Sequence, residues 1–135
     1  MLDNAYVFVE FDGCARGMLE LCMFAEGSHD EQRISVVGSE AKAEVCIPSM
    51  ECSIGLRATG REGVTTHVET SECAYEGLHH GSSYREHLAL REAISSGRSS
   101  LASLRDGTRS VAIGIAAQTS IQEKRRVTLS EVGYE

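Results

Sequence analysis

Hydrophobic and polar residues alternate through the first half of the chain with the two-residue period of β-strands. Paired runs of this kind flank three turn signals: Tyr6–Phe11 and Arg16–Phe24 around Asp12-Gly13, Gln32–Val37 and Ala41–Ile47 around Gly38-Ser39-Glu40, and Cys52–Thr59 and Val64–Thr70 around Gly60-Arg61-Glu62-Gly63. Pro48 ends the second pair, because proline cannot donate a hydrogen bond to a β-ladder. Three consecutive hairpins predict a mainly antiparallel sheet of about six strands over residues 5–70.

The hydrophobic period changes to that of α-helices at Ser83. A first helix is expected from a capping box formed by Ser83 and Glu86 to about Ser96. A second helix is expected from an N-cap at Asp106 to about residue 123, and residues 127–129 could add a short final strand. The pattern therefore predicts one α+β domain over residues 1–135, in which two helices within residues 83–123 pack on one face of the sheet.

The first hairpin is apolar on both of its faces. One face is expected to carry Tyr6, Phe8, Met18, Cys22 and Phe24, and the other Val7, Val9, Leu19, Leu21 and Met23. Two helices can cover only one face of a sheet, so the other face needs a cover from outside the fold. The sequence therefore predicts self-association through the open sheet face, as a homodimer or a larger assembly.

Charge and cysteine content narrow the choice of partners and compartment. The 135 residues contain 13 Lys and Arg against 20 Asp and Glu, which gives a net charge of -7 and disfavours nucleic acid and anionic membranes as partners. No apolar run is long enough to cross a bilayer, and the first residues lack a basic leader. An odd set of five cysteines without a C-x-x-C pair indicates reduced thiols in a cytoplasmic protein: Cys14, Cys22, Cys46, Cys52 and Cys73.

The candidate chemistry lies in the histidine-containing loop before the first predicted helix. His79 and His80 precede that helix and His87 lies inside it, a spacing that does not favour a metal site. Backbone N–H groups at a helix N-terminus suit a small polar or anionic ligand, and the alternative is a solvated loop with a capping serine. Glu26 is expected to be a solvated turn carboxylate, with orientation of a ligand as the alternative, and Asp12 and Asp30 are expected to be turn residues. The basic residues 124–126 are expected to stabilise the C-terminal end of the second helix.

Several stretches together resemble the C-terminal domain of the glucose–fructose oxidoreductase, inositol dehydrogenase and rhizopine-catabolism family, abbreviated Gfo/Idh/MocA. They are residues 4–13 (NAYVFVEFDG), 18–27 (MLELCMFAEG), 34–38 (ISVVG), 80–87 (HGSSYREH) and 106–121 (DGTRSVAIGIAAQTSI). The resemblance covers nearly the whole chain, and it rests on the order of these stretches and on the closing helix. It implies an α+β domain with a large open sheet whose outer face mediates dimer or tetramer assembly.

The resemblance also implies a dehydrogenase that uses NAD or NADP to act on sugars, polyols or related hydroxy compounds. The chain lacks a G-x-G-x-x-G loop, a Glu-Lys-Pro stretch and the family's catalytic Asp/His helix. No catalytic, cofactor-binding or metal-binding residue is therefore assigned, and His79, His80 and Tyr84 are the expected substrate-binding residues. We expect a C-terminal domain or fragment that binds no cofactor and is inactive alone. The alternative is a stand-alone binding or assembly module that kept the fold and lost the redox chemistry.

Overall fold

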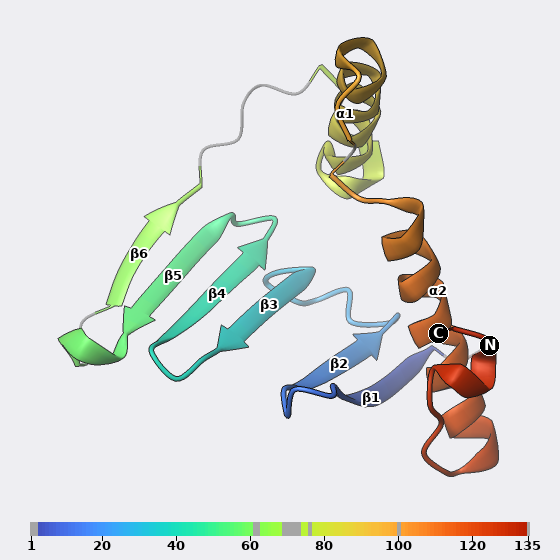
Figure 1. Ribbon diagram of the computed structural model, residues 1–135. Coiled ribbons are helices and arrows are strands. Elements are labelled where there is room, and N and C mark those ends of the chain that lie inside the picture. The colour runs from blue at the N-terminus through green and yellow to red at the C-terminus, as the bar shows by residue number, and fades with distance from the viewer. Residues whose placement is uncertain (1–2, 61–62, 69–73, 76, 100, 135) are drawn as a thin grey trace. The chain divides into compact units, whose positions relative to one another are not determined.

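The computed structural model describes residues 3–60, 63–68, 74–75, 77–99 and 101–134 (Figure 1). The chain divides into two units, Met1–Cys22 with Arg85–Glu135 and Met23–Tyr84, and each unit has its own internal contacts. The main elements in chain order are β1 (Asn4–Glu10), β2 (Arg16–Cys22), β3 (Gln32–Val37), β4 (Ala41–Ile47), β5 (Glu51–Leu56), β6 (Gly63–His67), α1 (Ser82–Ser96) and α2 (Leu104–Glu123). The α+β class and the six antiparallel strands are confirmed.

The six strands form a sheet of two strands, β1 and β2, and a sheet of four strands in the order β3-β4-β5-β6. All neighbouring strands are antiparallel, as three consecutive hairpins require. Predicted strand ends were less accurate than the strands themselves. The predicted Cys52–Thr59 strand ends at Leu56 and continues as a 3₁₀ helix, Arg57–Thr59, and residues 69–70 of the sixth predicted strand lie outside the described part of the chain.

The β1–β2 hairpin turns at Asp12-Gly13 as predicted. The Cys14 N–H donates to the Phe11 carbonyl over 3.1 Å, which closes a four-residue turn. Cys14 has a φ of 64°, so the residue after Gly13 takes the left-handed conformation. Strand β2 ends at Cys22 and a turn follows, so the predicted extension to Phe24 is wrong.

The strand register shows which residues share each face of this hairpin. Phe8 lies opposite Met18, and Tyr6 lies opposite Glu20. The Tyr6 hydroxyl donates to Glu20 Oε1 over 2.8 Å, and this contact raises the pKa of Tyr6. The face was predicted from its apolar members alone, but it carries a hydrogen-bonded carboxylate in its middle. Phe24 does not belong to it, because the strand has already ended.

The four-stranded sheet has an apolar face and a charged face. Cross-strand neighbours on the apolar face include Val36 opposite Ala43, and Ala43 opposite Ile54. On the charged face Glu44 contacts Arg33 over 2.7 Å and Lys42 over 2.9 Å. Lys42 and Arg33 together lower the pKa of Glu44.

Both helices begin earlier than the sequence suggested. Helix α1 begins at Ser82, so Ser83 lies within the helix and is not its N-cap. Helix α2 has Ser103 as its N-cap, and Asp106 is the third helical residue of the capping box rather than the cap itself. The Asp106 N–H donates to Ser103 Oγ over 3.2 Å, and the Ser103 N–H donates to Asp106 Oδ2 over 2.9 Å. None of the helices in the described residues is long and apolar enough to cross a bilayer.

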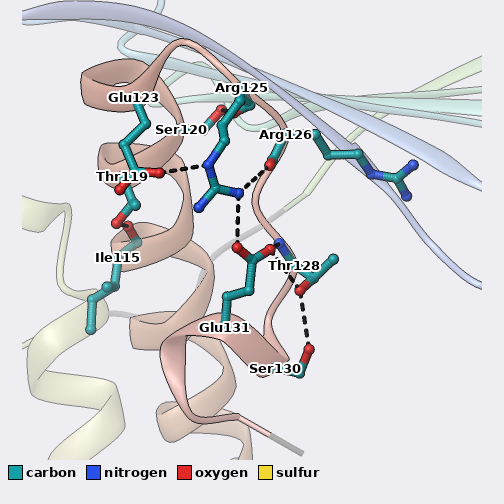
Figure 2. A network of polar contacts seen from close by, with 9 residues as sticks. All are labelled: Ile115, Thr119, Ser120, Glu123, Arg125, Arg126, Thr128, Ser130 and Glu131. Carbon is teal, nitrogen blue, oxygen red and sulfur yellow. Dashed lines mark hydrogen bonds and ion pairs between the residues drawn. The ribbon is translucent and has the colours of Figure 1, made fainter.

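The C-terminal segment folds back along α2 and is held by Arg125 (Figure 2). Arg125 contacts Glu123 Oε2 over 2.6 Å and Glu131 Oε2 over 2.8 Å, and Arg126 contacts Glu10 over 3.2 Å. These two arginines therefore form ion pairs, and Lys124 takes the left-handed conformation that ends α2. Residues 127–129 form no strand, because the Thr128 N–H donates to Glu131 instead of to a β-ladder.

Candidate functional site

The loop before α1 places the predicted histidines at a sharp change of backbone direction. A 3₁₀ helix, Gly77–His79, ends at His79, and His80 and Gly81 follow with φ angles of 50° and 80°. Glycine adopts this left-handed conformation at no steric cost, whereas a histidine does so rarely. Gly81 is buried, and α1 starts at the next residue.

His80 forms a pair with Glu31 that the sequence did not predict. His80 Nε2 lies 3.0 Å from Glu31 Oε2, although the two residues are 49 positions apart. The side chains are 36% and 54% exposed respectively, so both can reach a dissolved ligand. Both residues belong to the Met23–Tyr84 unit.

Asp30 fixes the segment that carries Glu31. Its Oδ1 atom accepts a hydrogen bond from the Ser49 N–H over 3.2 Å, and its Oδ2 atom lies 3.0 Å from His29 Nδ1. The hydrogen bonds from His29 and Ser49 lower the pKa of Asp30 to about 2, and Asp30 in turn raises the pKa of His29. Asp30 therefore ties the segment before β3 to the connection between β4 and β5.

The other two expected site residues are not joined to this pair. His79 is exposed at the end of its 3₁₀ helix, and Tyr84 is half-buried in the first turn of α1. Among the described residues, no side-chain hydrogen bond joins His79 or Tyr84 to His80 or Glu31. Glu31 is the residue that sequence reasoning missed, because nothing local to it indicates a partner so far along the chain.

The pair is suited to hydrogen bonding with a small polar molecule rather than to metal binding. Within the residues that the structure describes, no group of three or more His, Cys, Asp or Glu side chains is arranged to hold a metal ion. A carboxylate accepts hydrogen bonds, and an imidazole both donates and accepts them. With the imidazole proton donated to Glu31, the other ring nitrogen and the carboxylate can accept hydrogen bonds from hydroxyl groups of a ligand.

A separate hollow of about 450 Å³ lies where β3, β4 and β5 approach their turns. Its lining includes Lys42 and Arg57, the two groups that could attract an anion. Lys42 already contacts Glu44, and Arg57 donates to the Ser39 carbonyl over 3.4 Å. The polar groups here are occupied within the fold, so we place the candidate site at His80 and Glu31.

The comparison with protein families identifies the chain. The family model described as the oxidoreductase family C-terminal alpha/beta domain, of the Gfo/Idh/MocA type, matches residues 2–129 of the 135. The chain belongs to the Gfo/Idh/MocA oxidoreductase family. A comparison with the curated proteins found no match. The family assignment made from the sequence is therefore confirmed.

Membership of the Gfo/Idh/MocA family does not place a catalytic residue on this chain. The match is to the family's C-terminal domain, and the 135 residues contain no Glu-Lys-Pro stretch. Of the expected substrate-binding residues, His80 is the one with a side-chain partner among the described residues, and that partner is Glu31.

Proposed function

We propose that this domain supplies the substrate side and the assembly surface of an NAD(P)-dependent oxidoreductase that acts on a sugar, polyol or related hydroxy compound. The family match over residues 2–129 is the observation that carries the proposal. His80 and Glu31 support the substrate class, because their paired side chains can accept hydrogen bonds from hydroxyl groups. A neutral polyol offers such hydroxyl donors and requires no opposite charge.

The residues present do not fit a dinucleotide cofactor. Such a cofactor binds where a strand, a glycine-rich loop and a helix follow one another in a parallel βαβ unit. The described strands pair in antiparallel hairpins, and α1 and α2 follow each other directly. The sequence also has no G-x-G-x-x-G loop. In this proposal the 135 residues therefore hold no NAD(P), and they are inactive in hydride transfer without a cofactor-binding domain.

The proposed assembly surface is the face of the β1–β2 hairpin that carries Phe8 and Met18. These two side chains lie opposite each other and are 76% and 62% exposed. On the opposite face Ala5, Val7 and Val9 of β1 are half-buried, whereas Leu19 and Leu21 of β2 are 56% and 40% exposed. A large exposed apolar pair on one side of a sheet supports self-association, with a second copy of the chain as the cover.

Calorimetric titration tests whether this chain binds the substrate and leaves NAD(P) binding to another domain. We expect no heat of binding with NAD or NADP, and weak binding of myo-inositol, D-glucose or D-sorbitol that His80→Ala reduces. His67→Ala is the matched control, because His67 is an exposed histidine in β6. Micromolar binding of NAD or NADP by this chain would contradict the proposal, as would polyol binding that His80→Ala leaves unchanged.

The second candidate is a stand-alone binding or assembly module without redox chemistry. The exposed Phe8 and Met18 pair favours it, because that surface serves assembly whether or not a substrate is bound. Self-association without any polyol binding would support this module over the oxidoreductase role.

A further inference from the structure

The hydrogen bond between His80 and Glu31 has a defined direction. A carboxylate oxygen can only accept a hydrogen bond, so His80 Nε2, which lies 3.0 Å from Glu31 Oε2, is the donor. A neutral imidazole carries one proton, and with that proton on Nε2 the Nδ1 atom keeps its lone pair. Glu31 therefore favours one of the two tautomers of His80.

The Nδ1 atom of His80 is available for a ligand. Among the described residues, the contact with Glu31 is the one side-chain hydrogen bond that the His80 ring makes. The side chain of His80 is 36% exposed, so part of it reaches solvent. An unshared lone pair on a ring nitrogen accepts a hydrogen bond from a hydroxyl group.

Two local features restrict how the pair can move. Asp30, next to Glu31, is bound to the Ser49 N–H, which restrains the backbone that carries Glu31. His80 itself lies in the left-handed region, followed by Gly81 in the same region, which restricts the backbone at the histidine end. A histidine whose backbone is restricted and whose ring is bound to Glu31 is better prepared for a ligand than a histidine on a free loop.

We propose that Glu31 is a positioning residue that holds His80 as the Nε2–H tautomer and so presents the Nδ1 lone pair to a hydroxyl group of a neutral polyol. The ligand class rests on the proposed function, whereas the role of Glu31 rests on the observed contact. His80 contacts the ligand, and Glu31 acts through His80.

Nuclear magnetic resonance tests the tautomer directly. In the ¹⁵N-labelled chain at mildly alkaline pH, we expect His80 Nε2 to show the chemical shift of a protonated nitrogen and Nδ1 that of a bare nitrogen. In Glu31→Ala the two shifts should move toward each other, because the tautomers then exchange. Glu31→Gln should retain part of the original pattern, since its amide oxygen can still accept from Nε2–H. Glu26→Ala, at an exposed glutamate in a turn, is the matched control and should change nothing.

Addition of myo-inositol to the same samples tests the ligand. We expect the His80 Nδ1 signal to shift, and the affinity to fall about three- to tenfold in Glu31→Ala, the range expected for one misplaced hydrogen bond. Averaged His80 shifts in the unmodified chain, or shifts that Glu31→Ala does not move, would overturn the role of Glu31 alone. An Nδ1 signal unchanged by myo-inositol, D-glucose and D-sorbitol would overturn the ligand assignment, and with it the substrate class of the proposed function.

Discussion

Replacing Phe8 with aspartate should separate copies of this chain that associate through the β1–β2 face. Phe8 is 76% exposed and lies opposite Met18, so a second copy that covers both removes two large apolar side chains from water. Full burial of each contributes about 1.5–3 kcal/mol, or roughly 3–6 kcal/mol for the pair in each copy. Two such surfaces related by a two-fold axis suit an obligate interface of roughly 2,000 Å² in total.

The size of the effect depends on what replaces the ring. Phe8→Ala loses only the burial of the side chain, once in each of the two copies, which corresponds to about a 100- to 10,000-fold weaker association. Phe8→Asp also buries a carboxylate without a partner in each copy, so the loss should exceed that of Phe8→Ala. Met18→Asp should act in the same way. Leu101→Asp is the control, because Leu101 is 97% exposed and lies outside the sheets.

Glu20 adds a second, more specific test of the same face. Its carboxylate accepts a hydrogen bond from the Tyr6 hydroxyl over 2.8 Å, so Glu20 keeps a hydrogen-bond partner when an interface buries it. Tyr6→Phe removes that partner and should weaken association, although it adds no charge and keeps the ring. Phe8→Asp and Tyr6→Phe therefore test the same surface in different ways, because the first buries an unpaired charge and the second removes one hydrogen bond.

Sedimentation equilibrium measures these constants. The unmodified chain should sediment at a multiple of its 14.6 kDa mass, and the Phe8→Asp variant at the monomer mass. Circular dichroism should show unchanged secondary structure in each variant, so that a loss of association is not a loss of folding. A clean 14.6 kDa monomer of the unmodified chain at micromolar concentration would refute the argument from the exposed face.

Three further perturbations test the local structure. Ser103→Ala removes the N-cap of α2 and should cost about 1 kcal/mol, or roughly 3–4 °C in thermal midpoint for a chain of this length; an unchanged midpoint would contradict the capping box. The His29–Asp30 contact should stabilise the fold between about pH 4 and 6.5. The pKa of Asp30 is lowered to about 2, so the stability that its carboxylate contributes is lost as the pH falls from 4 toward 2. The pKa of His29 is raised, so the stability that its imidazolium contributes is lost as the pH rises above 6.5. Urea unfolding of Asp30→Asn across pH checks this window, since the difference from the unmodified chain should vanish near pH 2. Tyr134→Ala removes both the hydrogen bond from Arg109 Nε, 3.1 Å, and the stacking of that guanidinium on the ring, so amide exchange in residues 127–134 should become faster, and Tyr134→Phe should have a smaller effect.

The strands could be predicted from sequence because their determinants are local. Alternating side chains set the strands, and turn residues such as Asp12-Gly13 set the hairpins, so the strand number and the three hairpin pairings are confirmed, although the strands form two sheets instead of one. The helix starts were wrong by one to three residues, since several serines and acids near each start can form a cap. At α2, Asp106 does belong to the capping box, but the cap lies three residues earlier at Ser103.

The contents of each sheet face and of the site depended on long-range contacts and were harder to predict. Periodicity identified Phe8 and Met18 as one face, but only the register shows that Glu20, on the same face, lies opposite Tyr6. His80 was expected to bind a ligand from its place before a helix, yet its partner Glu31 lies 49 residues away. Residues 127–129 read as a strand from their β-branched side chains, and a hydrogen bond to Glu131 takes the place of the ladder.

The proposed substrate side depends on the four-stranded sheet, even though neither His80 nor Glu31 lies within a strand. Glu31 directly precedes β3, so the position where that strand begins decides where its carboxylate is placed. Asp30 holds the same segment to Ser49, in the connection between β4 and β5. A shift in the pairing of β3 with β4 would therefore move Glu31 relative to the Ser49 nitrogen, which holds Asp30. The position of Glu31 thus depends on strand pairing. A substitution that weakens the sheet should reduce the preference of His80 for the Nε2–H tautomer while the domain is still folded.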